Sequence, residues 1–211
     1  MRRSRIGAAL VAAGLAVSLV GCGGGKDDAT DLPTIGGQSS GPSSSTPGPT
    51  TPAPPTAVPT TSTQKYGPLT LILNHTATSS ENAQLALQAY QEYERSSHNT
   101  LATNVEDPKL AERSSGSALQ DIRNVLRDQK SKGVRTGGAI TVTVKVTRSS
   151  GGLAALTGCY DQSKSLLVRA NGTSYVGPGT KKSPRIKIEV VVTNVASLWK
   201  VTEYNLKGDK C

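Results

Sequence analysis

The sequence predicts an α+β domain in which N-terminal helices pack on one face of a curved antiparallel sheet, behind a long N-terminal tether. Two changes along the chain predict this class. Apolar side chains recur at helical spacing between residues 78 and 132, and from residue 139 onward they alternate with polar ones, as in half-buried strands. Between residues 23 and 65 neither pattern is present, and Pro, Thr, Ser and Gly dominate. Helices followed by a run of strands are typical of α+β domains.

The N-terminus has the parts of a bacterial lipoprotein signal. Arginines near the start are followed by an apolar run, residues 6–20, which is too short for a membrane-spanning helix. Leu19-Val20-Gly21-Cys22 then fits a lipobox, in which small residues precede the cysteine that receives the lipid. We therefore expect residues 1–21 to be the signal peptide and Cys22 to anchor the mature chain to the outer face of the cell membrane. The alternative is an ordinary secretory signal that contains a cysteine.

Residues 22–65 are predicted to form a disordered tether. Their composition cannot bury enough apolar surface to offset the entropy of ordering, and their prolines favour an extended backbone. Such a spacer would hold a domain away from the membrane. The remaining residues, 66–211, are long enough for one domain. Its core must come mainly from Leu, Val, Ile and Ala, because the chain has no Phe and a single Trp.

Three helices are predicted in the first half of the domain. The first covers residues 78–98, where Thr78 and Glu81 have the spacing of a capping box and Ser80 is another possible N-cap. The second starts at Asp107-Pro108, because Asp is a favoured N-cap and Pro is favoured at the first helical position. The third follows Ser117 and closes at Lys132-Gly133.

Strands are predicted in the second half of the domain. Residues 139–148 alternate strictly, which places Ile140, Val142, Val144 and Val146 on one face. The other predicted strands are residues 153–161, a hairpin of 165–170 and 173–176 that turns at Asn171-Gly172, a last hairpin of 185–193 and 198–206, and an edge strand of 67–73.

Two cysteines fall inside the domain. In an exported protein, an even pair such as Cys159 and Cys211 predicts a disulfide. The alternatives are a metal site or a redox pair. Two cysteines without a neighbouring third ligand are too few for a metal, and the C-x-x-C spacing of redox pairs is absent.

Short motifs along the whole chain resemble a known family. They are the lipobox, the tether, the helical pair Tyr90 and Tyr93, Cys159-Tyr160-Asp161, Trp199-Lys200-Val201, and Gly208 to Cys211. Together they resemble actinobacterial secreted lipoproteins with an NTF2-like domain, a cone of helices and bent antiparallel sheet. The resemblance implies a fold, a location and a disulfide. It implies no reaction, because most members of that family are uncharacterised.

Candidate cavity residues follow from the cone-shaped fold, whose mouth can hold a ligand. They are Tyr90, Tyr93, Asp161 and Trp199, together with Tyr160. Each also has a structural explanation: aromatic residues pack in cores, and Asp161 before a polar stretch suits a turn. His75 and His98 are far apart in the sequence, and no catalytic, phosphate-binding or dinucleotide motif occurs. We therefore predict no catalytic residue, no metal and no cofactor.

The charge suggests an anionic partner. The chain carries a net charge of +9, and Lys181, Lys182, Arg185 and Lys187 concentrate positive charge near one loop. The alternative is a solubilising surface, and we expect no specific nucleic-acid binding, because interleaved aromatic residues are missing.

Three functions are therefore considered. The preferred one is a non-enzymatic module that binds a protein or an anionic cell-envelope polymer. The second is a protein that binds or turns over a small molecule in its cavity. The third is an immunity or exclusion lipoprotein of a mobile element, which fits the architecture but has no sequence feature of its own.

Overall fold

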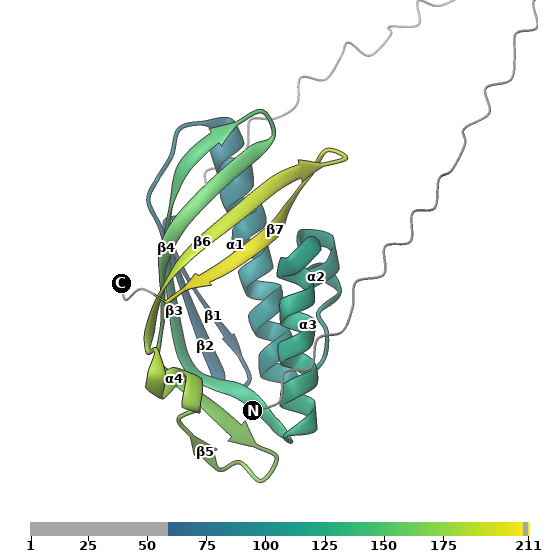
Figure 1. Cartoon of the computed structure of the whole chain (residues 1–211), viewed down its shortest axis with the longest axis vertical. Helices are drawn as coiled ribbons and strands as arrows, with labels where there is room; N and C mark the ends of the chain where they lie inside the picture. The colour runs from purple at the N-terminus through teal and green to yellow at the C-terminus, as the bar shows by residue number, and fades with distance from the viewer. Residues whose placement is uncertain (1–58, 209–210) are drawn as a thin grey trace, which may run out of the picture. The chain divides into compact units, whose positions relative to one another are not determined.

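The computed structural model describes residues 59–208 and residue 211, and these form an α+β domain (Figure 1). The predictions for the signal peptide, for Cys22 and for most of the tether lie outside the described residues. Within them, helices pack on one face of an open sheet in which antiparallel pairs dominate, as the sequence predicts.

The sheet contains seven strands. Its order is β1-β2-β3-β4-β6-β7, and the short strand β5 pairs with β4. Every pair is antiparallel except β2 and β3. The strands are β1 Thr61–Tyr66, β2 Leu69–His75, β3 Val134–Ser150, β4 Leu153–Arg169, β5 Ser174–Tyr175, β6 Arg185–Val195 and β7 Leu198–Lys207.

The predicted start of the second helix and the end of the third agree with the structure, whereas the first helix begins after Ser80 and not with the Thr78–Glu81 capping box. The helices are α1 Glu81–Thr103, α2 Pro108–Arg113, α3 Gly116–Ser131 and the short α4 Pro178–Lys182. The Asp107 side chain caps α2 by accepting a hydrogen bond from the backbone N–H of Lys109. Lys132 is the C-cap of α3, and Gly133 follows with a positive φ of 62°. The capping residue of α1 is Ser80, without a side-chain hydrogen bond.

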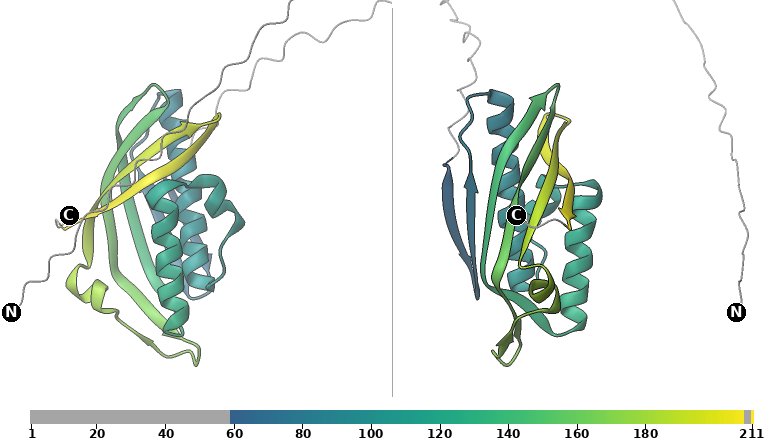
Figure 2. Two further views of the ribbon diagram at one scale, coloured as in Figure 1. Left: turned by 45° about the vertical axis from the view of Figure 1, so that its right-hand side comes forward. Right: turned by 60° about the vertical axis from the view of Figure 1, so that its left-hand side comes forward.

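The core lies between the helices and the sheet. Long helix α1 packs against β3 and β7, and α3 packs beside it, so both helices lie on the side toward which the sheet curves (Figure 2). The alternation in β3 predicted this correctly, because Ile140, Val142 and Val144 are buried and Val146 is partly buried. Trp199 of β7 is in the same core.

The N-terminal strands differ from the prediction. Strand β1 already begins at Thr61, ahead of the expected domain start at residue 66. The segment predicted as an edge strand forms β2, which lies inside the sheet between β1 and β3 and runs parallel to β3. The helices explain the parallel pairing. They form a long crossover between β2 and β3, and such a connection returns the chain in its original direction.

The region around Asp161 also differs from the prediction. We expected a strand to end there, but β4 continues through it to Arg169. The pairing with β3 shifts register between Ala139 and Thr141, which marks a β-bulge. Asp161 Oδ1 accepts a hydrogen bond of 2.9 Å from the backbone N–H of Ser163 at this bulge. On β3, Gly138 has a φ of 77°. A bulge increases local twist and bends the strand, so one long strand replaces the predicted turn.

The predicted disulfide is present. Cys159 of β4 is bonded to Cys211, with Cα atoms 5.7 Å apart and a sequence separation of 52 residues. The bond therefore ties the C-terminal residue to the middle of the sheet.

Candidate functional site

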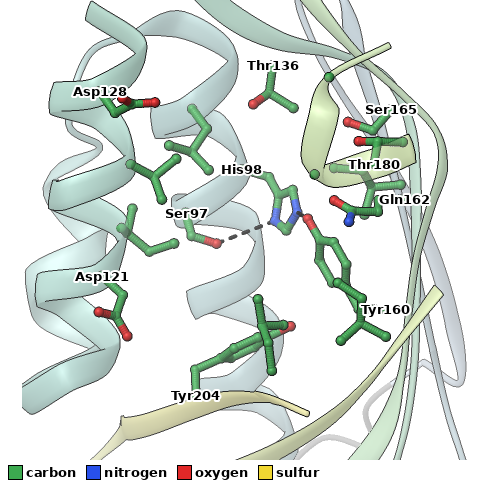
Figure 3. A pocket seen from close by; sticks show the side chains of 18 of the residues that line it. Ser97, His98, Asp121, Asp128, Thr136, Tyr160, Gln162, Ser165, Thr180 and Tyr204 are labelled. Atoms are coloured by element: carbon green, nitrogen blue, oxygen red, sulfur yellow. Dashed lines mark hydrogen bonds between the residues drawn. The ribbon is translucent and has the colours of Figure 1, made fainter. Parts of the chain in front are cut away.

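A cavity of about 870 Å³ opens between α1, α3 and the curved sheet (Figure 3). Most of its exposed lining is apolar. Gly177, the N-cap of α4, and the first residues of α4 as far as Thr180 line part of its border. Its apolar lining includes Leu101, Ile122, Val125, Ile140, Leu167, Ile186 and Leu206.

A polar cluster lies in this apolar lining. Glu94 and His98 are one helical turn apart on α1, and Glu94 Oε2 lies 3.3 Å from His98 Nδ1. The other ring nitrogen, Nε2, is 3.1 Å from the hydroxyl of Tyr160 on β4. Figure 3 shows the imidazole between Ser97 and Tyr160, inside the pocket. The cluster therefore joins helix and sheet at the cavity wall.

Glu94 is the most unusual member of the cluster, because it is a carboxyl group that is only 1% exposed. Burial raises its pKa, and His98 and the hydroxyls of Tyr90 and Tyr204 partly oppose that effect. These hydroxyls are close enough to influence the carboxyl group, but neither makes a well-aligned hydrogen bond among the described residues. Glu94 Oε1 likewise has no hydrogen-bond partner there. The three groups face one another inside the protein, and this mutual contact opposes the effect of burial on the Glu94 pKa.

The tyrosine at the end of the cluster stays protonated. Burial raises the pKa of Tyr160, and the nearby Glu94 carboxyl group raises it further. A neutral phenol is a hydrogen-bonding group rather than a nucleophile. In the part of the chain that the structure describes, no group of three His, Cys, Asp or Glu side chains is placed to hold a metal ion. The cluster of Glu94, His98 and Tyr160 therefore offers hydrogen-bonding groups to the cavity.

The structure separates the four candidate cavity residues. Tyr93 lines the cavity, and its ring centroid is 5.7 Å from that of Tyr204. Tyr90 and Trp199 lie in the core, 1% and 6% exposed. Asp161 is not among the lining residues, and its carboxylate accepts a hydrogen bond of 2.9 Å from Arg185 of β6. Its neighbour Tyr160 lines the cavity instead, because successive side chains of a strand point to opposite faces.

The candidate anion patch is divided by its ion pairs. Arg185 pairs with Asp161, and Lys187 lies 3.7 Å from Glu189. Lys181 and Lys182 are exposed in the last turn of α4 and make no ion pair with another described residue. Of the four, Lys181 and Lys182 are thus the two whose positive charge is not offset by a described acidic side chain.

Glu94, His98 and Tyr204 line the cavity but were not among the site residues predicted from the sequence. A signal was present, because Tyr90, Glu94 and His98 are spaced four residues apart and share one helix face. That face also carries the apolar residues that pack against the sheet. An acidic side chain and a histidine on the buried face of a helix need hydrogen-bonding partners. Their presence on that face could therefore have indicated a site in the sequence.

Comparisons with known proteins find only distant similarity. No known family model and no curated protein sequence matches the chain. Among solved structures, the intermembrane space region of the chloroplast protein ARC6 has a TM-score of 0.43 and 16% identity, covering 60% of this chain and 97% of its own. Aln2 from a Streptomyces species has a TM-score of 0.39 and 12% identity, covering 63% of this chain and 93% of its own. Neither similarity assigns a family or a function.

Proposed function

We propose that this protein is a cell-surface lipoprotein, anchored through Cys22, whose domain binds an apolar small molecule in the cavity between helices and sheet. The buried Glu94–His98–Tyr160 cluster carries this proposal. Ligand pockets typically enclose about 300–1,000 Å³, are mostly apolar and contain a few convergent polar groups. The cavity of about 870 Å³ meets this description. Burying a carboxyl group that is only 1% exposed costs stability, which favours a role for Glu94 other than packing.

Binding of a neutral fluorescent dye tests the ligand site. The mature chain carrying Cys22→Ala, which avoids detergent, is titrated with Nile red. We expect saturable binding with one site per chain. Ile186→Trp, which places a larger side chain in the cavity wall, should weaken it. Leu153→Trp is the matched control, because Leu153 is 39% exposed and does not line the cavity. Absence of Nile red binding, or equal weakening by both substitutions, would contradict the proposal.

The membrane anchor is a separate proposal with its own test. None of the described helices is long and apolar enough to cross a membrane. Two or three acyl chains on Cys22 would hold the chain stably, whereas a single chain binds only marginally. We expect the native chain in the membrane fraction of cells and the Cys22→Ala variant in the soluble fraction. A variant that stays with the membrane would contradict lipid anchoring at Cys22.

A second candidate function, binding of an anionic envelope polymer, is favoured by Lys181 and Lys182. Both are exposed and have no ion-pair partner among the described residues. Such a contact should weaken with salt. Retention of cell-wall polymer by the wild type, and loss in Lys181→Glu/Lys182→Glu, would support it. A Lys109→Glu/Lys145→Glu variant, changed at lysines outside the loop, should retain the polymer.

A further inference from the structure

Hydrogen-bond directions in the polar cluster follow from one contact. His98 Nδ1 lies 2.8 Å from the backbone oxygen of Glu94. A carbonyl oxygen can only accept, so Nδ1 carries the hydrogen. In the neutral imidazole, Nε2 then has a lone pair and no hydrogen. While His98 is neutral, the Tyr160 hydroxyl, 3.1 Å from Nε2, therefore donates a hydrogen bond to His98.

This arrangement leaves Tyr160 as an acceptor toward the cavity. Its only proton is used on His98, and the lone pairs of its oxygen are available to a group in the pocket. Burial raises the pKa of Tyr160, so the hydroxyl keeps this proton, and the acceptor role holds while His98 is neutral. A ligand that uses it must bring a hydrogen-bond donor.

The charges around the cavity disfavour an acid. Glu94 lines the cavity, so a bound carboxylate would lie near a second carboxyl group. Two neighbouring carboxyl groups must either share a proton or place two negative charges side by side, and both arrangements disfavour binding of an acid. At the rim, Asp121 and Asp128 of α3 line the opening (Figure 3). Lys132 is the sole Lys or Arg among the described lining residues, and its Nζ is 2.7 Å from Asp128 Oδ2. The charged side chains that line the cavity are thus net negative in a chain with a net charge of +9.

We propose that the ligand is an uncharged amphipathic molecule whose hydroxyl donates a hydrogen bond to Tyr160, while its hydrocarbon part lies along Leu101, Ile122, Ile140 and Ile186. This deepens the proposed function and rests on it. Fatty acids and other anionic amphiphiles are rejected at the same site, because both the wall and the rim carry acidic groups.

A matched pair of competitors tests the inference. Nile red bound to the mature Cys22→Ala chain is displaced with 1-dodecanol or with dodecanoate at pH 7.5, below their micellar concentrations. We expect dodecanol to bind at least about tenfold more tightly, which corresponds to about 1.4 kcal/mol. Equal or tighter binding of dodecanoate would overturn the inference and leave the proposed ligand site standing. Failure of Nile red itself to bind would overturn the site and the inference together.

Two substitutions test which residues cause the preference for dodecanol over dodecanoate. Tyr160→Phe removes the acceptor and should weaken dodecanol about three- to tenfold, the effect of one lost hydrogen bond, when each displacement is corrected for the Nile red affinity measured in the same variant. Tyr175→Phe, on β5 outside the cavity, should change neither. Glu94→Gln should tighten dodecanoate binding and narrow the preference, whereas the exposed Glu203→Gln should not. Unchanged dodecanol binding in Tyr160→Phe would refute the assignment.

Discussion

Removing the Cys159–Cys211 disulfide should destabilise the domain by a calculable amount. The bond closes a loop with a sequence separation of 52 residues. In the chain-entropy model a loop of this length lowers the entropy of the unfolded chain by about 14 cal/mol/K, which is about 4 kcal/mol at 25 °C. For a domain of this size, that corresponds to a melting temperature roughly 8–16 °C lower. The Cys159→Ala/Cys211→Ala variant should approach this loss.

Urea denaturation followed by tryptophan fluorescence measures the effect. The chain has one tryptophan, Trp199, which is 6% exposed in the core and reports global unfolding. With a slope of about 2 kcal/mol/M, the midpoint should fall by about 2 M. The slope itself should rise, because an unfolded chain without the cross-link is more expanded and exposes more surface.

Reduced wild-type protein separates the cross-link from the lost side chains. It keeps both cysteines, so dithiothreitol should reproduce most of the change seen in the double variant. A loss below about 1 kcal/mol, with an unchanged slope, would refute the reasoning. It would mean that the C-terminal residue adds little constraint to the unfolded chain.

Three further changes have expected outcomes. Burial raises the pKa of Glu94 above its value in the unfolded chain. The contribution of Glu94 to stability is therefore complete below the unfolded pKa and is lost as pH rises through the folded pKa. In urea denaturation between about pH 5 and 8, the free energy of unfolding should fall less in Glu94→Gln than in the wild type. Burial alone would raise the pKa of Asp161, but hydrogen bonds, including one from Arg185, lower it overall. The contribution of Asp161 to stability is therefore lost as pH falls. The free energy of unfolding lost between about pH 7 and 3 should be smaller in Asp161→Asn than in the wild type, by at most about 1 kcal/mol. Gly138→Ala, with a φ of 77° and a β4 carbonyl in the path of the new methyl, should cost well over about 2 kcal/mol in thermal denaturation, whereas Gly133→Ala, with open space around it, should cost only about 1–2 kcal/mol.

Local signals in the sequence predicted much of the fold. Asp107-Pro108 starts a helix, and Lys132-Gly133 ends one, because capping depends on groups within a few residues of each other. The alternation in β3 predicted its buried face, because the period of a strand is set by its own backbone. The cysteine count predicted the disulfide. Membrane anchoring through Cys22 remains a prediction from the sequence.

The tertiary structure alone decided the sheet order, the course of β4 and the site. Strand β2 pairs with β3 across three helices, and no local pattern specifies that neighbour. The bulge beside Asp161 depends on the partner strand, so β4 resembled two strands in sequence. His98 and Tyr160 are 62 residues apart in the chain but 3.1 Å apart in space. Local patterns record what each segment prefers by itself, whereas the cavity exists only where the bent sheet brings distant segments to the same helix face.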